Sequence, residues 1–480
     1  MDRIYHSEEE LLEVIEGALK IPFNKFENVS RLISKKGGVG QFVEEEIFKR
    51  ECNSLSEPDI NELGIEIKTT PFIYKKNGEV KAKERLVLGI INYNDENLKD
   101  FYKSHFWEKN QKLLIAFYYH NSLVEKTDWY LDSYILYKWP IEDLAIVIND
   151  WKTIVKKIAE GKAHELSEGD TLYLGVCTKG ATSESSYRSQ PFSFIPAKQR
   201  AYCLKQKYMT TLLEDYVYGN KTNERIITNV NDLEGRTLKE YIVDKFNNYV
   251  GRSQKELIDL LKVPKSKQIN NSIVKRIFNL NNNIDDTDEF KKAGIKTKTV
   301  RINHDDSVTE SMSFPSFKFM DIIDQENFYD SDIYDMFANT IFMFIYFKKA
   351  HKGDNDTDMI FEGVNIWSMP EKDLEEVAKV YDNLRKTLIE GVELIKTPYG
   401  DKYRIENNLP KKDENQISHI RPHTSNARYK FDDIDIGKNT DGDTLPDGRI
   451  MTKQSFWLNN DYIKNIYLEW KNKKLYDLIL

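Results

Sequence analysis

The residues whose types and spacing best suit chemistry lie in the segment EPDINELGIEIKTT, residues 57–70. Glu66 and Lys68 stand two positions apart in a β-branched run, which predicts a strand with both side chains on one face and isoleucines on the other. Asp59 follows a proline, which favours an extended turn into that strand. Two carboxylates and an ammonium are therefore expected to converge. Hard oxygen ligands for Mg²⁺, with a cation close to a scissile phosphate, are what metal-dependent phosphodiester hydrolysis requires.

A third carboxylate, Glu44, lies about one helical turn after the bend GGVG at residues 37–40 and is available to the same site. The alternative is structural, because a glutamate and a lysine two positions apart are also typical of the solvated face of an edge strand. The presence of Asp59 and Glu44 favours the catalytic interpretation.

Length and composition set the broad class. The chain has 480 residues, of which 40% are hydrophobic and 12% aromatic, as in a folded protein long enough for two domains. Its three scattered cysteines predict neither a disulfide framework nor a zinc site, and favour the cytoplasm. We expect no membrane partner, because no apolar run reaches membrane-spanning length. The net charge of −8 argues mildly against coating nucleic acid through bulk charge, but leaves room for local basic clusters.

The chain contains a weak internal repeat. Gly64-Ile65 recurs as Gly294-Ile295, Pro140 as Pro370, and Asp143-Leu144 as Asp373-Leu374, each pair 230 positions apart. Repeat architectures show such a constant offset, whereas accidental similarity of helix and strand patterns would not keep one register. We predict a mixed α/β protein made of two tandem copies of one fold, with domains at residues 1–222 and 245–480 and a linker at 223–244.

Hydrophobic periodicity predicts the elements that must position the site in the first copy. We expect helices at residues 8–18, 39–50 and 143–160, and strands at 64–70, 85–93, 113–119 and 130–137.

The second copy provides an internal comparison. The position of Asp59 is taken there by Glu289, that of Glu66 by Lys296 and that of Glu44 by Val274, while Lys68 keeps its type as Lys298. An ammonium cannot replace a carboxylate that neutralises Mg²⁺. The second copy is therefore expected to be catalytically inactive.

Three segments have the composition of DNA contacts. Basic residues stand beside small or hydroxylated ones in CTKGAT and AKQRAYCLKQKY, and again in the C-terminal loop HIRPHTSNARY. Such loops suit a DNA groove, with lysine or arginine on phosphate or guanine and threonine on a thymine methyl. Ordinary surface lysines are the alternative. The candidates are Thr178, Lys179, Arg200, Lys205, Arg421 and His423.

At these residues the sequence resembles the MutH-like nucleases, a branch of the PD-(D/E)XK fold. That branch holds a mismatch-repair nicking enzyme and two-lobed type II restriction endonucleases that cut GATC. The resemblance to the restriction enzymes covers essentially the whole chain, through segments such as KERLVLGIINY, GKAHELSEG, CTKGA, ESMSF, RPHT and MTKQSFWLNNDYIK.

The resemblance implies a role for each matching residue. Asp59 and Glu66 would ligate Mg²⁺ together with the Ile67 carbonyl, Lys68 would orient or help deprotonate the attacking water, and Glu44 would assist at the metal. Lys36 would contact DNA, and Thr178-Lys179 falls on the base-reading loop. The family has Arg-Pro-Lys in that loop, but this sequence has Cys177-Thr178-Lys179 there. The family pattern persists in the second copy as Arg421-Pro422-His423.

The expected function is that of a type II restriction endonuclease. It would recognise double-stranded GATC, cleave 5′ of G by Mg²⁺-dependent hydrolysis and engage two DNA sites together. A cognate DNA methyltransferase would be its functional partner without being bound. Two alternatives stay open: a catalytically inactive sequence-specific DNA-binding protein, and a MutH-like mismatch-repair nickase.

Overall fold

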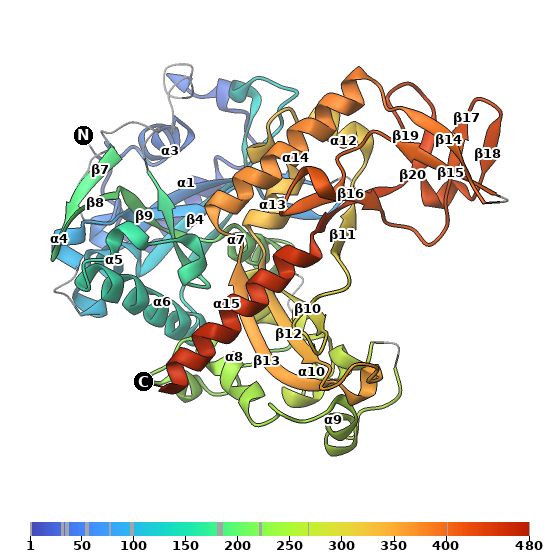
Figure 1. Ribbon diagram of the computed structural model, residues 1–480. Coiled ribbons are helices and arrows are strands. Elements are labelled where there is room, and N and C mark those ends of the chain that lie inside the picture. The colour runs from blue at the N-terminus through green and yellow to red at the C-terminus, as the bar shows by residue number, and fades with distance from the viewer. Residues whose placement is uncertain are drawn as a thin grey trace. The chain divides into compact units, whose positions relative to one another are not determined.

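The computed structural model describes residues 2–29, 33, 38–52, 57–75, 78–96, 100–179, 186–219, 223–266, 268–400 and 402–479. The chain forms two compact units, each mixed α/β (Figure 1). The first unit comprises Met1–Lys245 and Phe278–Ile295, and the second comprises Phe246–Ile277 and Lys296–Leu480. Residues 278–295, which the repeat places in the second copy, are thus grouped with the first unit.

The first unit contains nine strands and most of the N-terminal helices among its described residues. Its strands are β1 (Glu66–Tyr74), β2 (Val80–Ala82), β3 (Leu86–Ile90), β4 (Lys112–Tyr119), β5 (Leu131–Lys138), β6 (Leu174–Thr178), β7 (Tyr187–Gln190), β8 (Ser193–Lys198) and β9 (Arg200–Leu204). Its helices are α1 (Glu8–Glu16), α3 (Gly38–Phe42), α4 (Tyr93–Glu96), α5 (His105–Asn110), α6 (Ile141–Ala159), α7 (Gln206–Leu212), α11 (Asp288–Ala293) and α8 (Leu238–Asn247), which runs across the boundary.

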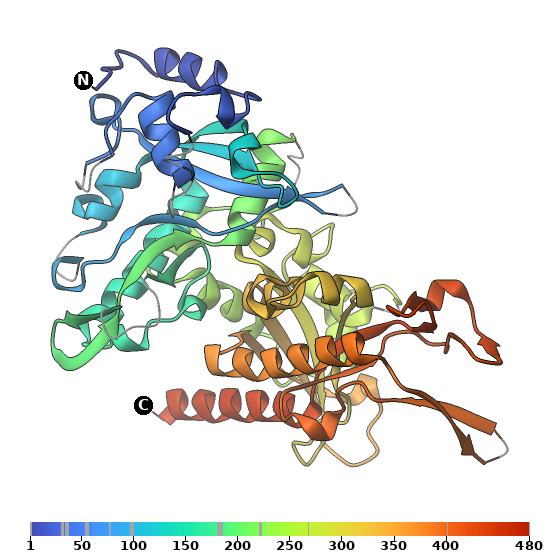
Figure 2. The same ribbon diagram turned by 90° about the horizontal axis from the view of Figure 1, so that it is seen from above.

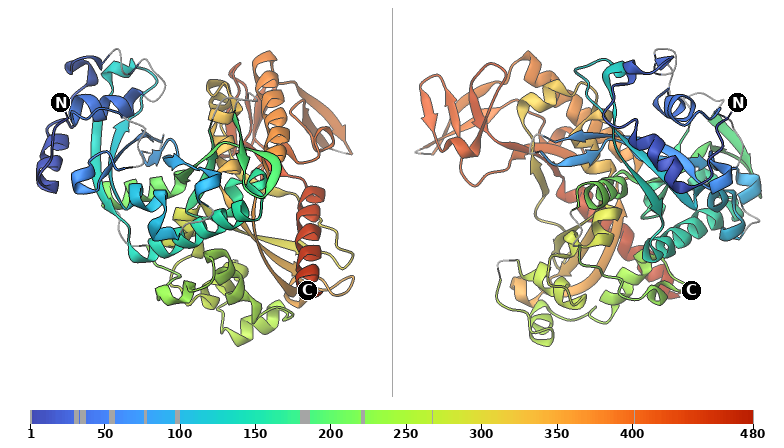
Figure 3. Two further views of the ribbon diagram at one scale, coloured as in Figure 1. Left: turned by 90° about the vertical axis from the view of Figure 1, so that its left-hand side faces the viewer. Right: turned by 180° about the vertical axis from the view of Figure 1, so that it is seen from behind.

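The main sheet of this unit has the strand order β2-β1-β4-β5. Strand β1 runs parallel to β4, with Glu66 opposite Leu113, and the other pairs are antiparallel. Helices α1 and α3 cover one face, where Leu11 and Phe42 share a core with Ile67 of β1 (Figure 3). Because side chains alternate along a strand, Glu66 and Lys68 lie on the opposite face, as predicted.

A second sheet, β3-β9-β6, carries the first segment predicted to contact DNA. Its strands are antiparallel, and Thr178 at the end of β6 pairs with Arg200 at the start of β9.

The second unit is built from further sheets and two long helices. Its strands are β10 (Ile295–Ile302), β11 (Met312–Ser316), β12 (Ile341–Lys348), β13 (Ile360–Ser368), β14 (Leu394–Tyr399), β15 (Lys402–Asn407), β16 (Ser418–Pro422), β17 (Tyr429–Phe431), β18 (Ile434–Ile436), β19 (Gly442–Thr444), β20 (Ile450–Thr452) and β21 (Gln454–Leu458). Its helices are α9 (Gln254–Leu260), α10 (Ile269–Ile277), α12 (Phe319–Asp324), α13 (Asp332–Ala338), α14 (Glu371–Glu390) and α15 (Asn460–Ile479).

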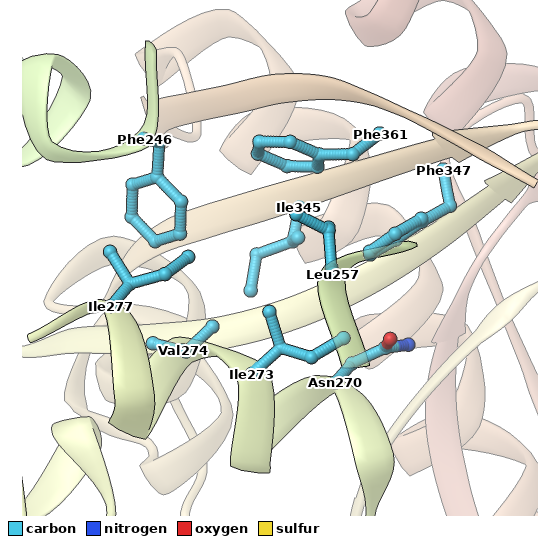
Figure 4. A pocket seen from close by; sticks show the side chains of 9 residues that line it. All are labelled: Phe246, Leu257, Asn270, Ile273, Val274, Ile277, Ile345, Phe347 and Phe361. Atoms are coloured by element: carbon cyan, nitrogen blue, oxygen red, sulfur yellow. The ribbon is translucent and has the colours of Figure 1, made fainter. Parts of the chain in front are cut away.

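Three of its sheets have the orders β10-β12-β13, β11-β21-β16 and β18-β17-β20-β19, and β14 pairs with β15 alone. Buried side chains from β12, α14, β21 and α15 form the core. A small apolar cavity lies between helices α9 and α10 and strands β12 and β13, lined by Phe246, Val274, Ile345 and Phe361 among others (Figure 4).

The two units share local features. The β4–β5 ladder shifts register between Phe117 and Tyr118, and the β12–β13 ladder shifts between Tyr346 and Phe347. Ser104 caps helix α5 by accepting a hydrogen bond from the Trp107 amide at 3.1 Å. Ser331 caps α13 in the same way, with the Tyr334 amide at 3.1 Å.

The predicted helices and strands of the first copy are present, with one informative difference. The helix expected at residues 39–50 is interrupted: α3 ends at Phe42 and a π-helical turn follows at Val43–Ile47. Single π-helical turns recur at functional sites, and this one carries Glu44. Cys52, Cys177 and Cys203 are all free thiols. Among the described residues, no helix combines the length and apolar character needed to cross a membrane.

Candidate active site

Asp59 and Glu66 are held together by two main-chain hydrogen bonds. The Asp59 amide donates to Glu66 Oε2 at 3.2 Å, and the Ile67 amide donates to Asp59 Oδ2 at 3.0 Å. The turn between them ends at Gly64, whose φ of 62° lies in the left-handed region that favours glycine. These hydrogen bonds and the turn therefore hold the Asp59 and Glu66 carboxylates next to each other.

Two lysines face the Glu66 carboxylate. Lys68 Nζ lies 2.5 Å from Glu66 Oε1, and Lys109 Nζ lies 3.4 Å from the same oxygen. Lys68 comes from β1 itself. Lys109 comes from α5, which leads directly into β4, the parallel neighbour of β1. The strand pairing thus brings a second ammonium to the site from 43 positions further along the chain.

Glu44 faces the same group of charges. Burial raises the pKa of Glu44, the Asp59 carboxylate raises it further, and the ammonium groups of Lys68 and Lys109 lower it. The Cys52 thiol donates to Glu44 Oε2 at 2.9 Å. This hydrogen bond lowers the pKa of Glu44. Burial and the same hydrogen bond raise the pKa of Cys52, so that Cys52 stays a thiol and a donor.

Arg50 braces the turn that carries Asp59. Its Nε donates to the Asp59 carbonyl at 3.1 Å, and its Nη2 donates to Glu62 Oε2 at 2.5 Å. Glu62 also accepts the Tyr5 amide at 2.8 Å. We assign Arg50 a positioning role, because its contact with Asp59 is to the main-chain carbonyl.

Burial controls the protonation of Glu66. Its side chain is 1% exposed, and desolvation raises its pKa from 4.5 to about 7. The Asp59 carboxylate acts in the same direction, whereas Lys68 and Lys109 lower the pKa. Two ammonium groups within 4 Å would ordinarily hold a carboxylate ionised, so desolvation here outweighs both.

The donor set fits a hard divalent cation. Asp59 and Glu66 offer adjacent carboxylate oxygens, and the main chain of Ile67 lies between the two side chains. Across the described ranges, no group of three or more His, Cys, Asp and Glu side chains is arranged as a metal cage. Mg²⁺ is usually held by one or two carboxylates and keeps several waters, so two carboxylates are sufficient for it.

The raised pKa of Glu66 predicts pH-dependent Mg²⁺ binding. Between pH 4.5 and about 7, Glu66 keeps a proton that an ordinary glutamate would lose, and a bound cation must displace that proton. The affinity for Mg²⁺ is expected to weaken by up to about tenfold for each pH unit below 7 and to level off above it. Titration calorimetry in two buffers of different ionisation enthalpy should show net proton release at pH 6 and little at pH 8.

A matched control is Glu66→Gln, which cannot titrate and should bind Mg²⁺ weakly at both pH values. Equal affinity and equal proton release at pH 6 and 8 in the unaltered protein would contradict the raised pKa.

The first DNA-contact loop lies at the end of strand β6. Thr178 is exposed and Lys179 is half-buried, whereas Arg200 is only 9% exposed. Arg200 Nη1 donates to Thr178 Oγ1 at 3.4 Å, which suits support of the loop better than a reach into solvent. Lys36, the other predicted contact of the first copy, lies outside the described residues.

The structure corrects the prediction for Lys205. It was predicted as a DNA contact, but its Nζ donates to the main-chain carbonyls of Glu168 at 2.8 Å and Thr171 at 2.5 Å. Desolvation lowers the pKa of Lys205 to about 8. An ammonium that already satisfies two interior carbonyls stabilises the fold and is not directed at DNA. The sequence did not reveal this, because a lysine in a basic run looks the same whether it points inward or outward.

Arg421 and His423 are both exposed at the end of β16 in the second unit. The Arg421 guanidinium lies 5.1 Å from the centre of the Trp457 ring, and Ser455 Oγ lies 3.2 Å from His423 Nδ1. These neighbours orient both side chains while leaving them accessible, as a groove contact requires.

The positions that the repeat pairs with the acidic residues and with Lys68 have other partners. Glu289 is fully buried and accepts the amides of Ile226 at 3.0 Å and Ile227 at 3.1 Å. Val274 lines the apolar cavity of the second unit (Figure 4). Lys298 Nζ donates to the Ser313 carbonyl at 3.2 Å. Each of these side chains serves the local packing.

The candidate site lies within a stretch that matches a known protein family. The family model described as DNA mismatch repair enzyme MutH matches residues 48–150, which include Asp59, Glu66, Lys68 and Lys109 but not Glu44. The type II restriction enzyme Sau3AI of Staphylococcus aureus is 38% identical over 445 residues, covering 87% of this chain and 89% of that enzyme. The DNA mismatch repair protein MutH of Shewanella woodyi (strain ATCC 51908 / MS32) is 31% identical over 154 residues, covering 32% of this chain and 64% of that protein.

The two relatives differ in how much of the chain they account for. The repair protein matches about a third of it, whereas the restriction enzyme matches most of both units. A site of two carboxylates and two lysines is also what such an enzyme needs to hydrolyse DNA. The chain therefore belongs to the MutH-related type II restriction endonucleases, site-specific deoxyribonucleases that act on DNA.

Proposed function

We propose that this enzyme recognises GATC in duplex DNA and hydrolyses the phosphodiester bond 5′ of G with Mg²⁺ as its cofactor. The observation that carries the proposal is the convergence of Asp59 and Glu66 with two lysine ammonium groups at the start of strand β1. Restriction endonucleases are in general divalent-metal dependent, and the choice of Mg²⁺ rests on the two-carboxylate donor set. The GATC sequence and the position of the cut rest on the resemblance to the two-lobed GATC-cutting enzymes.

Each residue of the site has a role in this proposal. Asp59, Glu66 and the Ile67 carbonyl would hold the cation, which when bound polarises the phosphate and lowers the pKa of water. Lys68 would orient the attacking water, or help deprotonate it when its own side chain is in the neutral amine form. Lys109 adds positive charge where charge develops on the phosphate oxygens. Glu44, whose pKa burial raises, would support the water or the cation from the π-helical turn.

The second copy is proposed to be an inactive DNA-binding lobe that acts as an effector. The matching register shifts and the matching serine caps in the two units support two tandem copies of one fold. The domains would then be residues 1–222 and 245–480, joined by a linker at 223–244. Loss of the acidic residues at Lys296 and Val274 supports inactivity, and the exposed Arg421 and His423 support DNA contact.

The reaction is tested by incubating the purified protein with plasmid DNA and Mg²⁺ and sequencing the ends. We expect both strands to be cut, and every end to begin at the G of GATC. Unmethylated and adenine-methylated plasmid should be compared, because a functionally paired methyltransferase protects the host DNA. Cutting at other sequences would contradict GATC, and binding without cutting would favour the DNA-binding alternative.

The effector role predicts that site number controls the rate. Linear duplexes with two GATC sites are expected to be cut about fivefold faster or more per site than duplexes with one, at equal site concentration. The control duplex replaces the second GATC by GTAC at the same spacing. Equal rates on all three substrates would remove the support for an effector lobe.

The repair-nickase alternative is less consistent with the chain. The mismatch repair relative matches about a third of this sequence, so a second lobe would have no counterpart in it. A nickase would leave single-strand breaks in the same plasmid experiment.

A further inference from the structure

The second unit carries a two-stranded hairpin, the β14–β15 arm, made of Leu394–Tyr399 and Lys402–Asn407. The two strands pair only with each other, from Leu394 opposite Asn407 to Tyr399 opposite Lys402. Figure 1 labels both strands, and Figure 2 shows the pair extending beyond helix α14. In the first unit, the 3-10 turns Ala163–Glu165 and Glu168–Asp170 follow helix α6, and a separate two-stranded pair, β7–β8, comes later in the chain.

The base of the arm is anchored and its outer part is exposed. Leu394 and Ile405 pack against the core of the second unit, and Arg449 donates to the carbonyl of Val392 just before the arm. Further out, Tyr399 is 66% exposed and Tyr403 is 41% exposed. A two-stranded hairpin with no apolar face to bury is only marginally stable in water. A surface of this kind is therefore typical of an element that becomes covered by a partner.

The exposed side chains alternate aromatic rings with cations. On one face of the arm, Lys396 Nζ lies 4.6 Å from the centre of the Tyr403 ring. On the other face, the Arg404 guanidinium lies 5.6 Å from the centre of the Tyr399 ring. Each ring thus holds a long cationic side chain extended along the hairpin, which lowers the entropy lost when that cation binds an anion.

The charge of the arm favours a polyanion. Residues 394–407 carry three cations, Lys396, Lys402 and Arg404, against two carboxylates, Asp401 and Glu406, in a chain whose net charge is −8. Arg404 pairs with Glu406, but both side chains are exposed, and an exposed pair contributes about 0–1 kcal/mol. DNA phosphates can readily displace such a pairing.

We propose that the β14–β15 arm lies in the major groove of the duplex bound by the second unit. The major groove admits either an α-helix or a two-stranded β-ribbon, and the arm is such a ribbon with cations on both faces. Lys396 and Arg404 bind phosphates on the two sides of the groove, and the tyrosine rings fill the space between them. This assignment rests on the proposed DNA-binding role of the second unit. A protein partner is the other class, and the following experiment separates the two.

The test uses the full chain carrying Glu66→Ala, so that bound DNA stays intact, with fluorescein-labelled duplexes containing one GATC. The arm variants add Lys396→Glu or Arg404→Glu, and a second pair, Lys396→Gln and Arg404→Gln, avoids charge reversal. The matched control is Lys386→Glu on helix α14 of the same unit, whose side chain is 68% exposed compared with 58% for Arg404 of the arm. Thermal unfolding of each variant should match the parent, because these side chains are exposed.

We expect the parent and the control to bind two duplexes per chain, and the charge-reversed variants to bind the second duplex at least about tenfold more weakly. With both cations replaced, the slope of log affinity against log salt should fall by about 2, one unit for each phosphate that the arm then leaves unbound. Dimethyl sulfate modifies guanine N7 in the major groove, so the parent should protect guanines that the variants leave reactive.

Other outcomes overturn the proposal in distinguishable ways. Two duplexes bound equally by parent and arm variants would remove the arm from the DNA interface. A change in sedimentation of the free chain without a change in DNA affinity would assign the arm to contact between copies. A parent that binds one duplex at every concentration would overturn the effector lobe itself, and with it the role of the arm.

Discussion

Replacement of Glu66 by alanine is expected to abolish cleavage, by at least about 10³-fold, while DNA binding is retained or strengthened. Glu66 is the most buried carboxylate of the site and contacts Asp59, Lys68 and Lys109. Its loss removes a ligand to the cation and leaves two ammonium groups without their counter-charge. Binding survives because removal of a carboxylate lowers the negative charge near the bound phosphates in the absence of metal. Single-turnover cleavage and fluorescence anisotropy measure the two effects separately.

The matched control is Glu57→Ala, an exposed carboxylate in the same segment whose described contact is the Asn61 side-chain amide at 2.8 Å. It should cleave at the normal rate. Mg²⁺-dependent cutting by the Glu66→Ala variant would overturn the assignment of the active site to this strand.

Replacement of Lys109 by methionine is the second large effect, an expected loss of about 10²-fold in the rate of cleavage with little change in DNA affinity. Methionine keeps the length and apolar stem of the side chain and removes the ammonium. The charge lost lies 3.4 Å from Glu66 Oε1, close to where negative charge develops on the phosphate oxygens. A further consequence is a higher pKa for Glu66, because Lys109 is one of the two cations that lower it. The pH–rate profile should therefore move to higher pH.

Lys103→Met is the control for this prediction, since Lys103 is an exposed lysine on the 3-10 turn just before α5. It removes one positive charge from the same region and should leave both rate and pH profile unchanged. An unaltered rate in Lys109→Met would show that Lys109 only neutralises Glu66 in the metal-free protein.

The strand that carries the candidate active site could be predicted because its conformation depends on residues that are close together in the sequence. Alternation along β1 puts Ile67 in the core and Glu66 and Lys68 on the other face, and a left-handed Gly64 ends the turn before it. The internal repeat in the sequence added a comparison within one chain, because Lys296 stands 230 positions after Glu66.

Lys109, Cys52 and Arg50 were missed because no local pattern distinguishes them. Lys109 reaches Glu66 through the parallel pairing of β1 with β4, a contact between segments that are distant in sequence. Cys52 and Arg50 act on Glu44 and on the Asp59 carbonyl after the chain turns back on itself. Only the position of Lys109 before a predicted strand offered a signal, and strand order was needed to use it.

The sequence by itself determined the short-range chemistry of this protein: two carboxylates and a lysine at strand spacing, and a set of positions 230 residues further on where Glu289 keeps a carboxylate but Lys296 and Val274 do not. The tertiary structure decided which other groups join them. It brought Lys109 to Glu66, turned Lys205 inward onto two carbonyls, and desolvated Glu66 enough to raise its pKa to about 7. Spacing along a strand is set by backbone geometry, whereas burial and the approach of distant charges depend on how the whole sheet is assembled.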